Sequence, residues 1–239
     1  MVWENMVGGL TFELTGDGGH QFVKWAPAGC GIDVRIEEAR MIWAAPYTAV
    51  PKVVGSGRDE TGGWLITCAA LGENAVTDRW KCDPAAAVAA IGEGLRALHD
   101  ALPVDSCPFS WSVEQRVAGA QRNARLGHLD PSTWHPDHRH LSVGEAIRLA
   151  AEIPTIDRLV VCHGDACAPN TLLTDDGRWS AHVDLGALGV ADRWADIAVA
   201  TWSTEWNYGP GWDNALLDAY GIAPDPVRTR YYRLLWDLT

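Results

Sequence analysis

The chain changes character near residue 70, and this change limits its possible folds more than any other feature. The first part contains short alternating segments typical of strands, with one helical stretch among them. From Pro84 onward helical spacing dominates. A β-rich part followed by a helical part predicts an α+β fold of two lobes with a cleft between them. We expect residues 1–70 to form the N-terminal lobe and residues 71–239 the C-terminal lobe.

Local patterns predict the elements of the N-terminal lobe. Alternation on both sides of a turn at Gly16–Gly19 indicates a hairpin over Leu10–Trp25. Ile32–Trp43 has an apolar and a charged side, which is typical of a helix. Two further short strands are expected at Lys52–Val54 and Gly63–Cys68.

The C-terminal lobe is predicted to be mainly helical, with three short strands in its middle. The expected helices are Pro84–Leu102, Val113–Leu126, Val143–Glu152, Ala191–Thr204, Trp212–Tyr220 and Pro226–Leu238. The expected strands are Leu159–Cys162, Thr171–Thr174 and Trp179–Val183.

The charge of the chain limits its partners. It has 31 acidic and 19 basic residues and a net charge of -12, so its surface repels phosphate backbones and nucleic acid is not expected as a partner. A polycationic small molecule fits this charge better, although acidity alone can serve solubility. No apolar run reaches the length of a membrane span, and the first residues lack the pattern of a signal peptide. We therefore expect a cytoplasmic protein, as a monomer or weak dimer, with no membrane partner.

Polar residues with catalytic potential gather in two short loops. His163–Asn170 follows the strand Leu159–Cys162, and Asp184–Gly186 follows the strand that begins at Trp179. Phosphoryl transfer needs a carboxylate to orient the acceptor hydroxyl and hard oxygen ligands for Mg²⁺. Asp165 could orient the acceptor hydroxyl, and Asn170 and Asp184 could bind Mg²⁺.

Two simpler readings of these loops remain open. Aspartate and asparagine often only cap turns in loops rich in glycine and proline. Cys162, His163 and Cys167 could indicate zinc, although their spacing fits no common zinc site, and buried packing is the ordinary role of such cysteines.

A second group of residues lies in the N-terminal part. Lys24 occurs on a predicted strand, and Glu37 lies on the helix that follows it. A Lys–Glu pair of this kind can hold the phosphates of ATP. Glu38 is adjacent and could serve instead of Glu37. The segment Val7–Gly9 could fold over phosphates but is a weak signal.

Three motifs stand out: CHGDACAPN at 162–170, HVDLG at 182–186 and GVADRWADIAVAT at 189–201. Together they resemble the aminoglycoside phosphotransferases, most closely the 3′-phosphotransferases of the kanamycin and neomycin kinase type and next the streptomycin 3″-phosphotransferases. The resemblance extends over nearly the whole chain. It implies a bilobal fold like that of protein kinases, ATP and Mg²⁺ as cofactors, and direct transfer to a hydroxyl group of an aminoglycoside antibiotic.

The resemblance also implies roles for single residues. Asp165 corresponds to the catalytic base, and Asn170 and Asp184 correspond to the metal ligands. Lys24 and Glu37 correspond to the pair that binds ATP. Cofactor binding is further expected at Phe22, against the base, and at the interlobe hinge Cys68–Ala70, with the backbone of Cys68 and Ala70 toward adenine.

Acceptor binding is expected from acidic groups of the C-terminal lobe, which can form charge-assisted bonds to ammonium groups. The candidates are Asp130, Glu205, Asp237 and the carboxylate of Thr239. Many relatives carry arginine directly after Gly186, whereas this chain has Ala187, and its last residues also depart from the family pattern. A kinase for an unrelated small metabolite alcohol is therefore the alternative. A protein kinase lacks support because no Ala-Pro-Glu segment follows Asp184.

Overall fold

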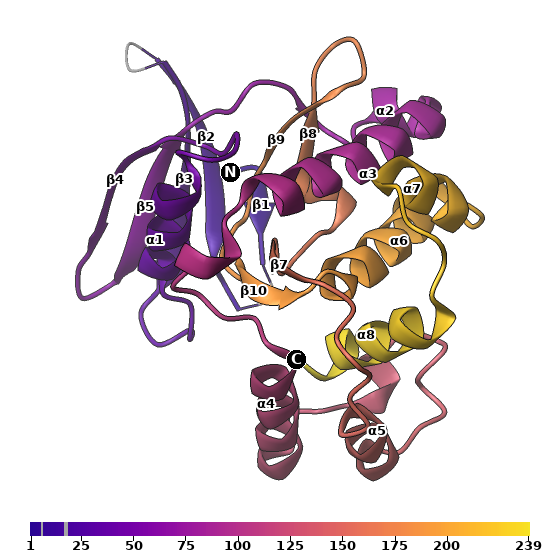
Figure 1. The fold of residues 1–239 in the computed structure, drawn as a ribbon. Helices are drawn as coiled ribbons and strands as arrows, with labels where there is room; N and C mark the ends of the chain where they lie inside the picture. Colours follow the sequence, from indigo (N-terminus) through magenta and orange to yellow (C-terminus); the bar gives the residue numbers. More distant parts are fainter. Residues whose placement is uncertain (6, 17–18) are drawn as a thin grey trace.

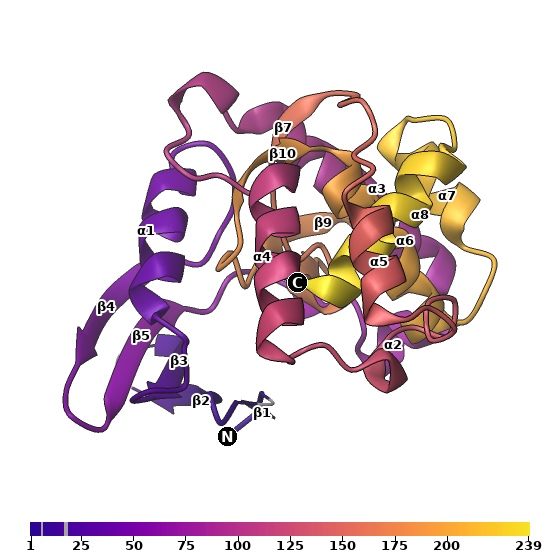
Figure 2. The same ribbon diagram turned by 90° about the horizontal axis from the view of Figure 1, so that it is seen from below.

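The computed structural model describes residues 1–5, 7–16 and 19–239. Asp17 and Gly18 of the expected turn lie outside the described residues. A sheet with one helix forms the first lobe, and a mainly helical body forms the second (Figure 1). The view from below shows the two lobes side by side, with α1 (Val34–Ala44) and the sheet apart from the helices of the second lobe (Figure 2). The predicted α+β, protein-kinase-like fold is confirmed.

The sheet of the first lobe is antiparallel with the order β1-β2-β3-β5-β4. Its strands are β1 (Trp3–Glu4), β2 (Leu10–Gly16), β3 (Gly19–Pro27), β4 (Val53–Arg58) and β5 (Gly62–Cys68). Lys24 pairs with Thr11 on one side and with Leu65 on the other, so it stands in the middle of the sheet. The predicted hairpin and both later strands are confirmed, whereas the short edge strand β1 was not predicted.

Helix α1 packs on the same sheet. Asp33 caps its N-terminus by accepting a hydrogen bond from the N–H of Arg35. The helix buries Val34, Met41 and Ala44, which recur at the spacing of one helical face. The exposed residues of α1 are Arg35, Ile36, Ala39 and Ile42. Glu37 in its first turn is half-buried and lies close to Gly186 of the other lobe.

The second lobe is built around α3, α6, α7 and α8. Its helices are α2 (Asp78–Cys82), α3 (Pro84–Ala101), α4 (Val113–Leu126), α5 (Val143–Ala150), α6 (Trp194–Tyr208), α7 (Asp213–Tyr220) and α8 (Pro226–Leu238). Gly92 lets α3 and α7 approach closely, because a Cβ atom there would lie 2.7 Å from the carbonyl oxygen of Leu216. None of the helices in the described part of the chain is both long and apolar enough to span a membrane.

Five short strands of the second lobe form two small sheets. One sheet pairs β7 with β10, and the other has the strand order β6-β8-β9. The strands are β6 (Glu73–Asn74), β7 (Leu159–Cys162), β8 (Thr171–Leu173), β9 (Trp179–His182) and β10 (Gly189–Asp192). In the centre of Figure 1 these strands separate the large sheet from the helical body. The loops after β7 and β9 therefore emerge between the two lobes.

One predicted helix begins too early. We expected a helix over Ala191–Thr204, but Ala191 and Asp192 belong to β10, which pairs with β7, and α6 begins at Trp194. The side chain of Asp192 accepts a hydrogen bond from the N–H of Trp194 at 3.0 Å, so this residue ends the strand and starts the helix. The other predicted helices are confirmed to within two residues at each end, and α2 and β6 were not predicted.

Candidate active site

The β8–β9 hairpin brings Asn170 and Asp184 together. Thr171 pairs with His182, so the residue before β8 and the loop after β9 meet at the open end of the hairpin. The N–H of Val183 donates to the carbonyl oxygen of Asn170 at 3.0 Å, which fixes this end. Asp184 has a φ of 63°, a conformation that residues other than glycine rarely adopt. The two predicted metal ligands therefore lie side by side.

Asp165 and Asn170 are oriented by a contact within their loop. The side-chain Nδ2 of Asn170 donates to the carbonyl oxygen of Asp165 at 2.9 Å, which leaves the Oδ1 of Asn170 available as a ligand. Oδ1 of Asp165 is buried and has no hydrogen-bond partner among the described residues. A buried carboxylate oxygen without a donor is costly, and a substrate hydroxyl group would satisfy it.

Lys24 joins the two lobes at this point. Its Nζ lies 2.6 Å from Oε1 of Glu37, and it also donates to Oδ1 of Asp184. The choice between the two glutamates is thereby resolved, because Glu38 instead accepts a hydrogen bond from the hydroxyl group of Ser56 at 2.7 Å. Two hard oxygen ligands, a lysine and an orphan carboxylate oxygen form a set that fits Mg²⁺ and nucleotide phosphates.

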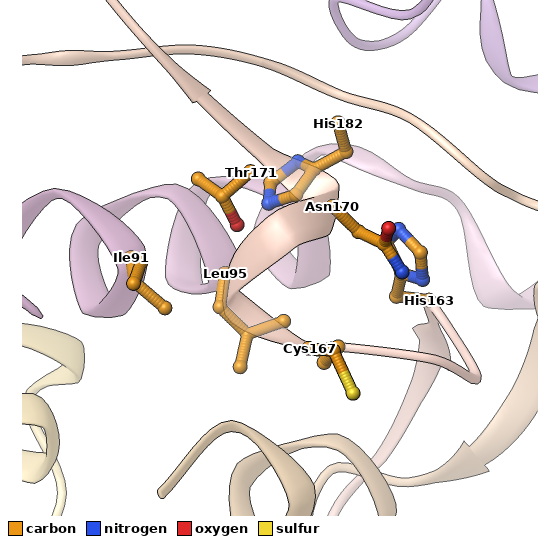
Figure 3. Close-up of a pocket in the computed structure, with 8 residues that line it drawn as sticks. Ile91, Leu95, His163, Cys167, Asn170, Thr171 and His182 are labelled. Carbon is orange, nitrogen blue, oxygen red and sulfur yellow. The ribbon is translucent and has the colours of Figure 1, made fainter. Parts of the chain in front are cut away.

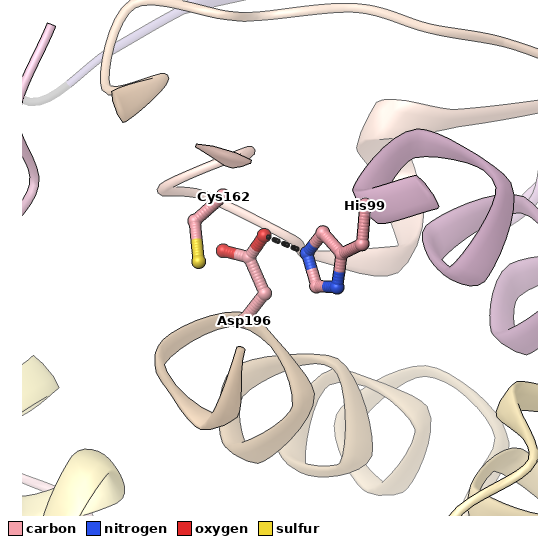
Figure 4. Close-up of side chains that lie close together, drawn as sticks. All are labelled: His99, Cys162 and Asp196. Atoms are coloured by element: carbon pink, nitrogen blue, oxygen red, sulfur yellow. Dashed lines mark hydrogen bonds and ion pairs between the residues drawn. The ribbon is translucent and has the colours of Figure 1, made fainter. Parts of the chain in front are cut away.

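Asp196 of α6 holds the backbone just before Asp165. Its Oδ2 accepts the N–H of His163 at 2.5 Å, and its Oδ1 accepts the N–H of Gly164 at 2.9 Å. Nε2 of His99 lies 3.0 Å from the same Oδ2 (Figure 4). The other ring nitrogen of His99 lies 2.8 Å from the hydroxyl oxygen of Tyr220. Burial favours a higher pKa for Asp196, but the hydrogen bond and charge of His99 outweigh it, and the pKa is lowered.

His99, Cys162 and Asp196 form the one group of potential metal ligands found among the described residues. Figure 4 shows the carboxylate of Asp196 between the other two side chains. Burial raises the pKa of the Cys162 thiol well above its ordinary value, so it stays protonated. Because Asp196 already accepts three hydrogen bonds, we interpret the group as a structural centre. The zinc alternative with Cys162, His163 and Cys167 gains no support.

The loop His163–Asn170 borders a small cavity between β8, β9 and α3, where Figure 3 shows the side chains of His163, Asn170 and His182 close together. Nε2 of His163 lies 2.9 Å from the carbonyl oxygen of Val183, and its Nδ1 accepts the N–H of Asp165. His163 thus contacts both loops. The cavity is lined by Ile91, Leu95, His163, Ala166, Cys167, Asn170, Thr171 and His182.

Gly164 packs against the backbone of Ala187 in the other loop. Gly164 has a φ of 84°, and a Cβ atom on it would lie 2.3 Å from the carbonyl oxygen of Ala187. Only glycine fits both the conformation and the space. The backbone of Ala187 therefore lies against the loop His163–Asn170.

The predicted nucleotide-binding residues lie next to Lys24. Phe22 is two residues before it on β3, so both side chains point to the same face of the sheet. At the end of β5 the N–H of Cys68 donates to the carbonyl oxygen of Lys52, and that of Ala69 donates to the carbonyl oxygen of His20. The N–H of Ala70 has no acceptor within the described part of the chain. The roles of Phe22, Cys68 and Ala70 remain predictions.

The four predicted acceptor-binding residues differ in their surroundings. Asp130 caps the short 3₁₀ turn Pro131–Thr133, and Asp237 accepts hydrogen bonds from the backbone N–H of His135 and the ring of His138. The hydroxyl group of Thr239 donates to the carbonyl oxygen of Leu235. Glu205 is exposed, and its side chain has no hydrogen-bond partner among the described residues. Its carboxylate is therefore available to a ligand.

Sequence reasoning missed two residues that hold the backbone of this site: His99 and Asp196. Asp196 lies inside the motif GVADRWADIAVAT, and His99 ends an apolar helix, but neither pattern assigns a partner. A charged residue in an otherwise apolar stretch, such as Asp196 between Ala195 and Ile197, was the available signal for a buried hydrogen-bond centre.

The sequence of this chain is similar to those of known phosphotransferases. The chain is 36% identical over 253 aligned positions to an aminoglycoside 3′-phosphotransferase from Streptomyces fradiae, covering 98% of this chain and 92% of that protein. It is 33% identical to a streptomycin 3″-kinase from Streptomyces griseus, covering 92% of this chain and 85% of that protein.

Solved structures of aminoglycoside phosphotransferases are similar to the fold of this chain. A type VIII aminoglycoside 3′-phosphotransferase superposes with a TM-score of 0.83 and 31% identity, covering all of this chain and 92% of that one. An aminoglycoside phosphotransferase from Streptomyces rimosus, solved with ADP and streptomycin, gives 0.77 and 28%, covering 93% of this chain and 88% of that one. The model of the phosphotransferase enzyme family matches residues 7–232. The chain therefore belongs to the phosphotransferase enzyme family.

Proposed function

We propose that this protein transfers the γ-phosphoryl group of ATP to a hydroxyl group of an aminoglycoside antibiotic, at the 3′ or 3″ position. The observation that carries the proposal is the buried, unpartnered Oδ1 of Asp165 beside Asn170, Asp184 and Lys24. Relatives named as 3′- and 3″-phosphotransferases support the acceptor class, and the relative solved with ADP and streptomycin supports the donor.

The chain supplies positioning and charge rather than covalent chemistry. Oδ1 of Asp165 accepts the proton of the acceptor hydroxyl group while the hydroxyl oxygen attacks the γ-phosphorus, and the bond from this phosphorus to the bridging oxygen breaks, which releases ADP. Asn170 and Asp184 would hold Mg²⁺, which when bound offsets the negative charge of the phosphates. Lys24, held by Glu37, is placed to bind phosphate oxygens when Asp184 turns to the metal. A single chain supplies all these groups, which supports activity as a monomer, and ATP as donor supports a cytoplasmic location.

We place the acceptor near the C-terminal half of α6. Ser203 of this helix accepts the N–H of Ala168 at 2.8 Å, so this part of α6 lies under the end of the catalytic loop. In the next turn Trp206 is 48% exposed and Glu205 has a free carboxylate. An exposed indole and a carboxylate suit a sugar ring that carries ammonium groups.

Phosphorylation of a panel of aminoglycosides by the purified protein with ATP and Mg²⁺ tests the proposal. We expect a product heavier by one phosphoryl group from at least one of kanamycin, neomycin and streptomycin, and none from the Asp165→Asn variant. An analogue without the 3′-hydroxyl group separates the two positions. If the protein binds ATP but modifies no member of the panel, the antibiotic is the wrong acceptor, and the same assay with small metabolite alcohols becomes the next experiment.

A further inference from the structure

Arg40 connects the two lobes at the loop that carries Asp184. It lies on α1 one turn after Glu37, so both side chains project from the same side of the helix. Nη1 of Arg40 donates a hydrogen bond to the carbonyl oxygen of Gly186, two residues after Asp184. Helix α1 therefore reaches the loop twice, through Glu37 and Lys24 to Asp184 and through Arg40 to Gly186.

The surroundings of Arg40 differ from those of an ordinary surface arginine. Its Nε is buried and has no hydrogen-bond partner among the described residues. Its guanidinium carbon lies 5.5 Å from the centre of the Phe109 ring, and the edge of Trp43 contacts the same ring from α1. Partial burial lowers the pKa of Arg40. A partly dehydrated cation held by an aromatic ring has few other orientations, so its bond to Gly186 is well defined.

The loop 184–186, which Arg40 contacts, needs contacts from other parts of the chain to keep its conformation. Asp184 adopts a left-handed backbone conformation that a non-glycine residue keeps only when its surroundings impose it. Leu185 anchors the loop from one side because its side chain is fully buried. On the other side α1 packs directly on Gly186, where a Cβ atom would lie 3.9 Å from Cβ of Glu37. The bond from Arg40 is the polar part of this second support.

We propose that Arg40 is a positioning residue that locks α1 onto the loop 184–186, so that the Lys24–Glu37 pair and Asp184 bind nucleotide and Mg²⁺ as one unit. This inference rests on the proposed function, because it assigns Arg40 to the same site. Arg40 acts through the backbone of Gly186 and needs no contact with a substrate.

Three variants test the proposal. Arg40→Met removes the donor and the charge but keeps most of the length, Arg40→Lys keeps a cation that can donate to Gly186, and Arg35→Met on the exposed side of α1 is the control. The affinity for a non-hydrolysable ATP analogue is measured by calorimetry over a series of Mg²⁺ concentrations. Steady-state kinetics then give kcat and the KM of the acceptor.

We expect Arg40→Met to weaken the Mg²⁺-dependent nucleotide affinity by about tenfold or more, the scale of one hydrogen bond to a charged group. It should also lower kcat and leave the KM of the acceptor within about twofold. Arg40→Lys should recover part of the affinity, and Arg35→Met should match the parent protein. A role in folding alone would instead lower the melting temperature and change all affinities together, without recovery by lysine.

The proposal is overturned if Arg40→Met binds the nucleotide like the parent protein at every Mg²⁺ concentration, or if Arg35→Met loses as much. If Arg40→Met does not fold, Arg40→Lys and Arg40→Gln provide the same comparison, with the glutamine variant expected to be the weaker. The titration needs no acceptor, so a protein that phosphorylates no aminoglycoside would refute the proposed function and still give a result for Arg40.

Discussion

The backbone N–H of Gly164 donates to Oδ1 of Asp196 across 2.9 Å, deep in the second lobe. The other oxygen of the same carboxylate accepts the N–H of His163. One buried side chain of α6 thus fixes two consecutive residues immediately before Asp165. The position of the proposed catalytic base is therefore set by a helix that follows it in the chain, not only by its own loop.

Asp196→Asn is expected to weaken both folding and catalysis. An amide offers one acceptor oxygen and places an NH₂ group against a backbone N–H, so at least one buried donor loses its partner. We expect the free energy of unfolding to fall by about 3–5 kcal/mol, as when one partner of a buried pair is removed. Urea denaturation measures this loss, and kcat should fall with it. Asp218→Asn, on the exposed side of α7, serves as the control; equal stability of the two variants would contradict the role of Asp196.

The carboxylate of Asp196 should make the stability of the protein depend on pH. The pKa of Asp196 is lowered: burial raises it, but the hydrogen bond and charge of His99 more than compensate. A lowered folded-state pKa stabilises the protein above the ordinary aspartate value of 3.8, and this contribution is lost as the pH falls through the lowered value. The parent protein should thus lose more stability than Asp196→Asn when urea titrations are repeated from about pH 6 to about pH 3. Parallel pH profiles would show that Asp196 has no such linkage.

Asp165→Asn is expected to abolish most of the turnover and leave nucleotide binding intact. The amide cannot accept the hydroxyl proton, and loss of a general base typically lowers kcat by about 10²–10⁴-fold. No hydrogen bond or ion pair joins Asp165 to Lys24 in the described part of the chain, so the affinity for ATP should change little. Single-turnover kinetics and nucleotide titration measure the two effects separately. A variant that keeps more than about a tenth of the parent kcat would remove Asp165 from this role.

Gly164→Ala tests the contact between the catalytic loop and Ala187. The added methyl group would meet a backbone carbonyl at 2.3 Å, and the φ of 84° would become strained. We expect the free energy of unfolding, measured by urea denaturation, to fall by at least about 1–3 kcal/mol. We also expect a lower kcat. Gly119→Ala is the matched control, because a Cβ atom there meets nothing within 4 Å in the middle of α4. That control should gain about 0.5–1 kcal/mol.

The proximity of Asn170 and Asp184 could be predicted from the sequence because both lie next to short strands, β8 and β9, whose pairing brings them together. Asp165 follows β7 and meets Asn170 within its own loop, where Asn170 donates a hydrogen bond to its carbonyl oxygen. The roles of the three residues as base and metal ligands stay predictions. Asp196 could not be assigned in this way, because its partners lie more than thirty residues away along the chain. Helix patterns likewise predicted α4 to the residue, since its cap, apolar face and terminal Gly127 all lie within the segment.

The start of α6 was misplaced because Ala191 and Asp192 suit a helix locally, whereas pairing with β7 keeps them extended. The acids predicted to bind the acceptor were chosen by charge alone, and charge does not reveal that the carboxylate of Asp237 contacts the ring of His138. Their role stays a prediction. Pairing with distant residues can override the local preference of a segment, and a single sequence does not show which distant residues will pair with it.

Glu205→Gln tests the acceptor site. Glu205 is exposed beside Trp206 and free of partners in the described part of the chain, so its charge is available for an ammonium group. Removing one charge-assisted bond should raise the KM of the aminoglycoside by about five- to fiftyfold, with kcat and the KM of ATP nearly constant. Asp130→Asn is compared with it, because Asp130 is the other exposed acidic side chain among the predicted acceptor residues and caps a turn. If both variants keep the parent KM, neither acid binds the acceptor. An effect of Asp130→Asn alone would instead place the acceptor against the loop that precedes Pro131–Thr133.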